Sequence, residues 1–264
     1  MRIKGEKTTK GSIALLASTV TSCVAVLGNA QPAAAVEPGQ ALAAAQFAYD
    51  SWKKHKGLDD ISVATREIID AIEGSQENII ERIEAMGTSE ARTCARSAVL
   101  QVSSLPQMLP ESVEAFAAFT TTCVARIRTA LDDATNKRVT DQVGYALHAV
   151  APIALIANRK ANFTTVVNDL QTEIDRSSRV LLAKLKPACS VNEVGDDRPP
   201  APGASQEVIV RCVAYNGDIG TSNQFISATK PVSFTKAKLE AQRNTSDLLA
   251  REALRVGVLT PLPS

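Results

Sequence analysis

The sequence predicts a mainly α-helical fold: a disulfide-braced bundle of six or seven helices with a small β-hairpin near the C-terminus. Three observations support this fold class. Between residues 41 and 186, apolar residues recur at intervals of three and four, which is the period of a helix. Two short Val-rich stretches then flank a Pro- and Gly-rich segment, as in a hairpin. Four cysteines remain once an N-terminal export signal is set aside.

The first 35 residues predict a secretory signal peptide. Four basic residues and a single acid occupy the first twelve positions, and an uncharged stretch follows from Ile13 to Leu27. This stretch is shorter than the about 20 apolar residues that span a bilayer, so the pattern favours export over a membrane anchor. Small residues come next, and we expect cleavage between Ala30 and Ala35. The predicted localisation of the mature chain is therefore secreted and extracellular.

The expected mature chain is close to neutral. The whole chain has 29 basic and 28 acidic residues, of which the signal segment removes four and one, leaving 25 and 27 and a net charge of −2. A near-neutral protein has no strong field to attract a phosphate backbone, which argues against nucleic acid as a partner. We expect a helical bundle over residues 36–187. Residues 188–264 should form a hairpin with a Pro-rich loop and a C-terminal helix packed on the bundle.

The helical period divides the chain into seven predicted helices. Their expected ranges are 41–56, 61–86, 89–103, 111–133, 136–157, 161–186 and 233–256. The second is amphipathic, with isoleucines on one side and acidic residues on the other, and it faces either a bundle core or a coiled-coil partner. Pro152 is expected to kink the fifth helix or to split off its last turn.

The first cysteine pair is predicted from the lengths of two helices. A short connection with Pro106 and Pro110 makes the helices on either side of it antiparallel neighbours. Cys94 and Cys123 then lie at heights that differ by three residues, or roughly 4.5 Å at the helical rise. We therefore expect a Cys94–Cys123 disulfide, although four cysteines permit three pairings.

The second pair follows from the register of the predicted hairpin. Two strands are expected at residues 188–194 and 207–215. A register that places Cys189 opposite Cys212 also places Val191 opposite Val210 on the same face. The Pro-rich loop at residues 195–206 is tethered at its base, which makes it a candidate for partner contact. Because the chain has no CxxC spacing, the four cysteines are expected to be structural and not metal-binding.

The stretch from Val143 to Ala157 carries no formal charge over fifteen residues. A helix that is apolar on all sides is buried in something, and the favoured interpretation is the centre of its own bundle. The alternative is a membrane-inserting segment that stays masked until the protein meets a target cell.

Aromatic residues precede a basic cluster near the start of the mature chain. Phe47, Tyr49 and Trp52 are followed by three lysines and a histidine at residues 53–56. Cations at the end of a helix complement its dipole, and aromatic residues at helical spacing are usually packed in a core. The alternative function is contact with lipid headgroups or with an anionic polymer of a cell surface.

The two histidines provide little evidence for an enzyme. His148 shares a helical face with Tyr145 and Pro152 inside the uncharged stretch, so a buried, hydrogen-bonded histidine is favoured over a catalytic one. His55 and His148 also lack the neighbours of a His-Asp phospholipase site. The chain has no GxSxG, HExxH, GxGxxG or P-loop motif, and we expect no cofactor and no metal.

These observations favour a secreted, non-enzymatic helical protein that acts as a binding or structural module outside the cell. Its expected partner is an unidentified protein or cell-surface component. One alternative is a membrane-active protein of the pore-forming kind that uses residues 143–157. A weaker alternative is a secreted hydrolase with a site assembled from distant positions around His148.

Overall fold

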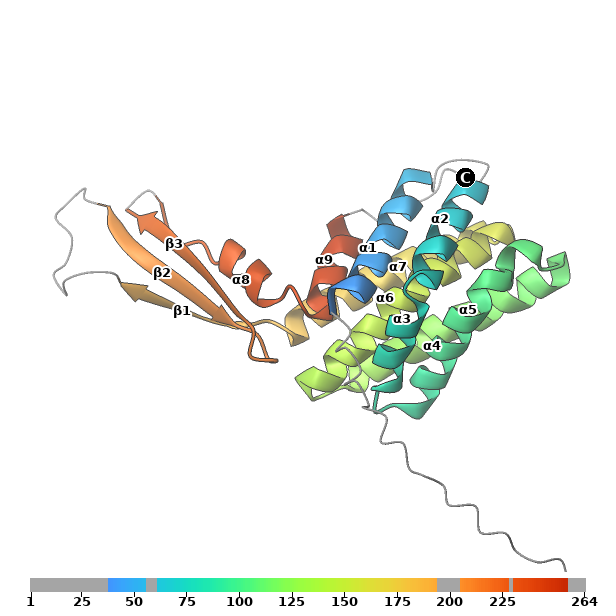
Figure 1. Cartoon of the computed structure of the whole chain (residues 1–264), viewed down its shortest axis with the longest axis horizontal. Helices are drawn as coiled ribbons and strands as arrows, with labels where there is room; N and C mark the ends of the chain where they lie inside the picture. Colours follow the sequence, from blue (N-terminus) through green and yellow to red (C-terminus); the bar gives the residue numbers. More distant parts are fainter. Residues whose placement is uncertain (1–37, 56–60, 194–204, 228–229, 256–264) are drawn as a thin grey trace, which may run out of the picture. The chain divides into compact units, whose positions relative to one another are not determined.

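The computed structural model describes residues 38–55, 61–193, 205–227 and 230–255 (Figure 1). The predicted signal peptide and most of the Pro-rich loop lie outside these ranges. The helices are α1 (Pro38–His55), α2 (Ser62–Glu73), α3 (Gln76–Glu84), α4 (Ser89–Gln101), η1 (Val102–Gln107, a 3-10 helix), α5 (Pro110–Asp133), α6 (Lys137–Lys160), α7 (Thr164–Lys184), α8 (Thr235–Ala241) and α9 (Ser246–Arg255). The strands are β1 (Ala188–Glu193), β2 (Gln206–Val213) and β3 (Ile219–Ile226). The prediction of a mainly helical fold is confirmed.

Helix α6 lies at the centre of the helical part. Every residue from Val143 to Asn158 is buried, and the helix contacts α1 to α5, α7 and α9. Gly144 permits the closest approach, because a Cβ atom there would collide with Leu181 of α7 and with the Ser246 hydroxyl of α9. The sequence suggested that Pro152 would kink this helix or split off its last turn. The last turn is not split off, because α6 continues without interruption to Lys160.

Two predicted long helices are each divided in two. The range 61–86 breaks at Gly74 and Ser75 into α2 and α3, since glycine is a poor helix former and the N–H of Ser75 bonds to the Ile72 carbonyl, three residues back instead of four. The apolar stripe continues across this break, which is why the period alone predicted one helix. The range 233–256 breaks after Ala241, where the Thr245 hydroxyl donates 2.9 Å to the Gln242 carbonyl.

Two lysines close the carboxyl ends of neighbouring helices. The ammonium group of Lys184 donates to the carbonyls of Leu131, Asp132 and Ala134 at 2.7, 2.8 and 2.8 Å, which are the free acceptors at the end of α5. The ammonium group of Lys160 donates to the Leu105 carbonyl of η1 at 2.8 Å. Lys184 thus satisfies carbonyls at the end of α5 that have no partner within that helix, whereas the Leu105 carbonyl also accepts from the Met108 N–H.

Helix α9 packs against α1, so the first and last helices of the described residues lie side by side (Figure 1). The Arg255 guanidinium forms a 3.0 Å ion pair with Asp50 of α1 and also contacts Glu252. Residues 205 positions apart in the sequence are therefore in direct contact.

The predicted hairpin is instead a three-stranded antiparallel sheet in the order β1-β2-β3. The β1–β2 register agrees with the expected one, with Cys189 opposite Cys212 and Val191 opposite Val210. Strand β3 was not predicted, because its sequence is polar and contains Gly220. The sheet has a small core of its own, made with α8 and separate from the core around α6.

Candidate functional site

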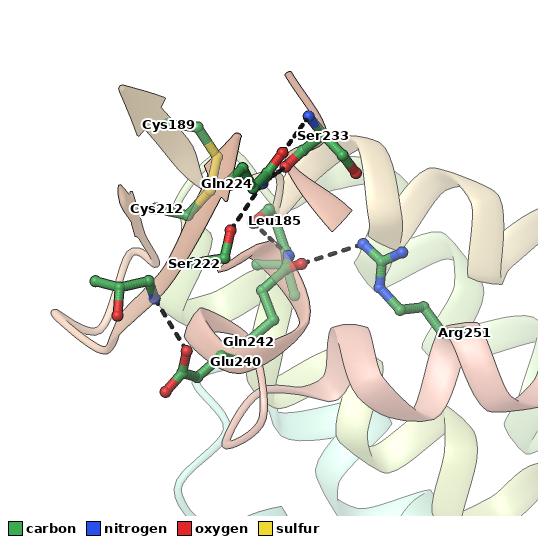
Figure 2. The surroundings of a disulfide bond; sticks show 10 residues. Leu185, Cys189, Cys212, Ser222, Gln224, Ser233, Glu240, Gln242 and Arg251 are labelled. Atoms are coloured by element: carbon green, nitrogen blue, oxygen red, sulfur yellow. Dashed lines mark hydrogen bonds between the residues drawn. A yellow bond between two sulfur atoms is a disulfide. The ribbon is translucent and has the colours of Figure 1, made fainter. Parts of the chain in front are cut away.

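Both disulfides join the cysteines that the sequence paired. Cys94 of α4 and Cys123 of α5 have Cα atoms 5.4 Å apart. Cys189 and Cys212 link β1 to β2 with Cα atoms 4.1 Å apart (Figure 2). The second bridge fixes the edge strand β1 to the sheet, next to the point where α7 ends.

One face of the sheet is covered by α8. Val210 and Cys212 pack against Ala237 and Ala241 of this short helix. The close approach depends on Gly220 of β3, because a Cβ atom there would overlap the Ala237 carbonyl and the backbone of Ala241. A glycine in a strand is typical of such a close backbone contact.

A glutamine side chain fastens β3 to the segment that leads into α8. The Gln224 amide nitrogen donates to the Ser222 hydroxyl at 2.9 Å and to the Ser233 carbonyl (Figure 2). The Gln224 amide oxygen accepts from the Ser233 N–H at 2.9 Å. The Gln224 side chain thus exchanges two hydrogen bonds with the backbone of Ser233, as a residue of a neighbouring strand would.

The two edges of the sheet differ. At the β3 edge, the Thr221 N–H donates 2.9 Å to the Glu240 carboxylate of α8 (Figure 2). The backbone N–H of Thr221 therefore points away from β2. In an antiparallel pair the residue opposite, Arg211, also points its backbone groups away from β3, so these groups face Ser190 of β1. The backbone groups of the next residue, Val191, then point outward.

The short Cα distance between Cys189 and Cys212 agrees with this register, since residues that do not exchange hydrogen bonds lie closer together. Among the described residues, no backbone bond closes the outer edge of β1. Among the described residues, Glu240 thus bonds to one edge of the sheet, and the other edge has no backbone partner.

The face of the sheet opposite α8 mixes apolar and polar side chains. Phe225 is 66% exposed and Ile219 is 46% exposed, and both belong to β3. Thr221 and Asn223 lie between them and are also exposed, next to Arg211 of β2. Large exposed apolar side chains among polar ones are typical of a surface that contacts a partner.

A buried network connects the sheet region to the helices. The Gln242 side chain donates 3.2 Å to the Leu185 carbonyl at the end of α7 and accepts 3.1 Å from Arg251 of α9 (Figure 2). Arg251 also forms a 2.6 Å ion pair with the buried Asp247. Burial raises the pKa of the Asp247 carboxyl, and the bond from Arg251 opposes that effect.

Asp141 of α6 forms a second connection. Its carboxylate accepts from the Tyr215 hydroxyl at 2.6 Å, and from the N–H and hydroxyl of Ser246 at 2.6 and 2.7 Å. Tyr215 follows β2 and Ser246 begins α9, so one nearly buried carboxylate joins three elements. Sequence reasoning missed this residue. No local pattern marks it, since its partners lie 74 and 105 positions away.

The sequence-predicted aromatic and basic cluster is mostly packed. Tyr49 and Trp52 are fully buried, whereas Phe47 is half-exposed. His55 is buried beside the Glu67 carboxylate at 3.4 Å, and Lys54 reaches the same carboxylate at 3.9 Å. Lys56 lies outside the described residues. Phe47, Lys53 and Lys54 are the exposed members of the cluster among the described residues.

His148 is fully buried, and its Nδ1 lies 2.7 Å from the Tyr49 hydroxyl. Burial lowers the pKa of the His148 imidazole to about 3, so the ring is neutral at physiological pH. No serine or aspartate of the described residues bonds to it, so the triad expected for a hydrolase is not assembled at His148. Within the same ranges, no group of three His, Cys, Asp or Glu residues is placed to hold a metal ion.

Helix α6 is long and apolar enough to cross a membrane by length and composition, and most of that stretch is buried inside the fold. The segment from Val143 to Ala157 therefore occupies the core, as the favoured interpretation required. Comparisons with protein-family models, with curated proteins and with solved structures found no match for this chain.

Proposed function

We propose that the protein is a secreted, non-enzymatic binding protein in which a disulfide-braced helical bundle carries a partner-binding sheet. The observation that carries this proposal is the free side of the sheet. Helix α8 covers one face and Glu240 bonds to one edge, while no other described residue covers the face with Phe225 and Ile219 or pairs with the edge at β1. A sheet with an open edge and exposed anchors suits an extended segment of a protein partner.

The support for export is indirect. Two disulfides are compatible with an oxidising, extracellular environment. The predicted signal peptide supplies the route.

Export is tested by expressing the full chain in a secreting host and sequencing the N-terminus of the protein in the medium. We expect a new N-terminus between residues 31 and 36 and no free thiol among Cys94, Cys123, Cys189 and Cys212. A chain that stays in the cells with Met1 intact contradicts the proposal.

The binding surface is tested with purified, fluorescently labelled protein and intact cells that carry candidate partners. We expect saturable binding that falls about tenfold in Phe225→Asp, the scale of an interface anchor. Leu109→Asp is the matched control, because Leu109 is 70% exposed and lies between η1 and α5, away from the sheet in the chain. Equal binding of both variants removes the sheet from the proposed interface.

A membrane-active function is the second candidate, and the length and composition of α6 favour it. Its action requires α6 to leave the core. Dye release from anionic liposomes, at neutral and mildly acidic pH, tests it directly. Release by the oxidised protein supports this function over a partner-binding one, and intact liposomes at both pH values reject it.

A further inference from the structure

A cleft of about 690 Å³ lies between α2, η1 and the end of α6. Its apolar lining comes from Ile61, Ile69 and Pro106. The Lys160 ammonium donates to the carbonyls of Leu105 and Pro106 at 2.8 and 3.1 Å, which fixes η1 to the end of α6 and holds one wall of the cleft in place. A cleft of this volume suits a small molecule or a short piece of peptide.

A nearly buried hydroxyl group lines this cleft. Thr65 of α2 is only 6% exposed, and its hydroxyl forms no hydrogen bond with any of the described residues. By contrast, the hydroxyls of the helical residues Thr120 and Thr140 each donate at 3.0 Å to the carbonyl four residues back. A buried hydroxyl without a hydrogen bond costs free energy, and a ligand in the cleft would supply that bond. The Thr65 side chain therefore indicates a ligand that carries hydrogen-bonding groups.

Charges of both signs line the same cleft along α2. Arg66 and Asp70 are about one turn apart, and Glu73 follows about one turn later. Arg66 and Asp70 have the i, i+4 spacing that permits an ion pair, yet within the described ranges none of these three side chains forms one. Arg159, at the end of α6, adds positive charge to the cleft. The α2 charges are therefore available to a ligand with charges of both signs.

The spacing of these charges selects the length of the ligand. Along the axis of α2, Arg66 and Glu73 are separated by about 10 Å at the helical rise. An extended peptide covers about 3.4 Å per residue, so the two ends of a tripeptide are separated by a similar length. Ile69 lies between the two charges on the cleft side of α2, where it meets the middle of such a peptide. A single amino acid is too short to reach both charges.

We propose that this cleft binds a short apolar peptide whose amino and carboxyl ends are both free. The carboxylate of the peptide pairs with the Arg66 guanidinium, and its ammonium group pairs with Asp70 and Glu73. Its apolar side chains pack on Ile69, and the Thr65 hydroxyl bonds to one of its peptide groups. The cleft belongs to the helices and uses no residue of the sheet, so its test is independent of the proposed partner surface.

The experiment is a titration of the ¹⁵N-labelled oxidised protein with the tripeptide leucyl-glycyl-leucine, followed by NMR. We expect saturable shifts of the Thr65, Ile69 and Gln107 amide signals, since these residues line the cleft. Acetylation of the amino end and amidation of the carboxyl end should each weaken binding about tenfold, because each removes one charged contact. Leucine has the same two charged groups but cannot span the cleft, and equal affinity for leucine and the tripeptide contradicts the assignment of a peptide.

Variants assign the individual contacts. Thr65→Val keeps the shape of the side chain but removes its hydroxyl, and it should weaken binding of the tripeptide about fivefold. Arg66→Gln should weaken binding of the free-acid peptide about tenfold and leave binding of the amidated peptide unchanged, which a damaged fold would not do.

Arg176→Gln is the matched control, because Arg176 is an exposed arginine of α7 that does not line the cleft, and it should leave binding unchanged. Arg66 is itself exposed, so its variant stays folded if Thr65→Val does not. Shifts that do not saturate, or affinities that Arg66→Gln leaves unaltered, overturn the proposal.

Discussion

The Tyr215 hydroxyl donates a 2.6 Å hydrogen bond to the Asp141 carboxylate, although 74 residues separate the two in the chain. Because Asp141 also accepts from the N–H of Ser246, the turn after β2 and the start of α9 share one acceptor on α6. The first N–H group of α9 has no acceptor within its own helix, and the Asp141 carboxylate provides one. It also places a negative charge at the positive end of the helix dipole.

Tyr215→Phe removes one hydrogen bond to a charged group and changes little else. We expect the free energy of unfolding to fall by about 1.5–3 kcal/mol, measured by urea denaturation. Tyr145→Phe is the matched control, since the buried Tyr145 hydroxyl has no hydrogen-bond partner among the described residues and its loss should be neutral or stabilising. Equal destabilisation by both variants contradicts the assigned role of Tyr215.

His148 makes the stability depend on pH. The folded imidazole has a pKa of about 3 because of burial, while the unfolded one titrates near its ordinary value of 6.5. Between these values the unfolded state binds the extra proton, so stability falls as the pH falls from 6.5 toward 3, by up to about 1.4 kcal/mol per pH unit.

This dependence is checked with His148→Gln, which does not titrate but can still bond to Tyr49. We expect the stability difference between wild type and variant to shrink by roughly 2.5 kcal/mol between pH 7 and pH 4.5. Parallel stability curves for the two proteins refute the assignment of the pH effect to His148.

Gly220→Ala introduces a methyl group where α8 lies directly on β3. The new Cβ atom meets the Ala237 carbonyl, which belongs to the backbone and cannot rotate away. We expect a loss of about 1–3 kcal/mol in thermal or urea unfolding. Gly87→Ala serves as the control, because nothing lies within 4 Å of its added Cβ atom, and it should be neutral or slightly stabilising.

Glu240→Ala uncovers the edge of β3. The Thr221 N–H then loses its carboxylate acceptor, and we expect its amide to exchange with deuterium about tenfold faster, as followed by NMR. Lys236→Ala, on the same short helix, should leave that rate unchanged. A protected Thr221 amide in Glu240→Ala means that another group closes the edge. Association at high concentration is a further expected consequence of the uncovered edge.

The parts of the fold that the sequence predicted depend on short-range patterns. The helical period located most helices, and the pairing of Cys189 with Cys212 followed from the alternation of side chains in two Val-rich strands. The period overran the break at Gly74 because its apolar positions continue in phase on both sides. Strand β3 gave no signal, since only Ile219, Phe225 and Ile226 among its eight residues are large and apolar.

The sites proposed here depend on contacts that no local pattern encodes. Tyr215 and Asp141 come together although 74 residues separate them in the chain. Glu240 reaches Thr221 only because Gly220 lets α8 approach. Such arrangements arise from tertiary packing, in which residues with no recognisable motif acquire a role from their neighbours. The disulfides could be predicted because each joins elements that are consecutive or share one hairpin.

The contact between Asp50 and Arg255 joins the first described helix to one that is made much later. A chain is made from its N-terminus onward, so α1 can pack against α2 early but against α9 only after α2 to α8 have been synthesised. Helices α6 and α7 likewise stay incompletely covered until α9 arrives. Long-range closure of this kind slows folding and keeps a growing chain open. In the export proposed for this chain, such a delay keeps the polypeptide unfolded while it crosses the membrane.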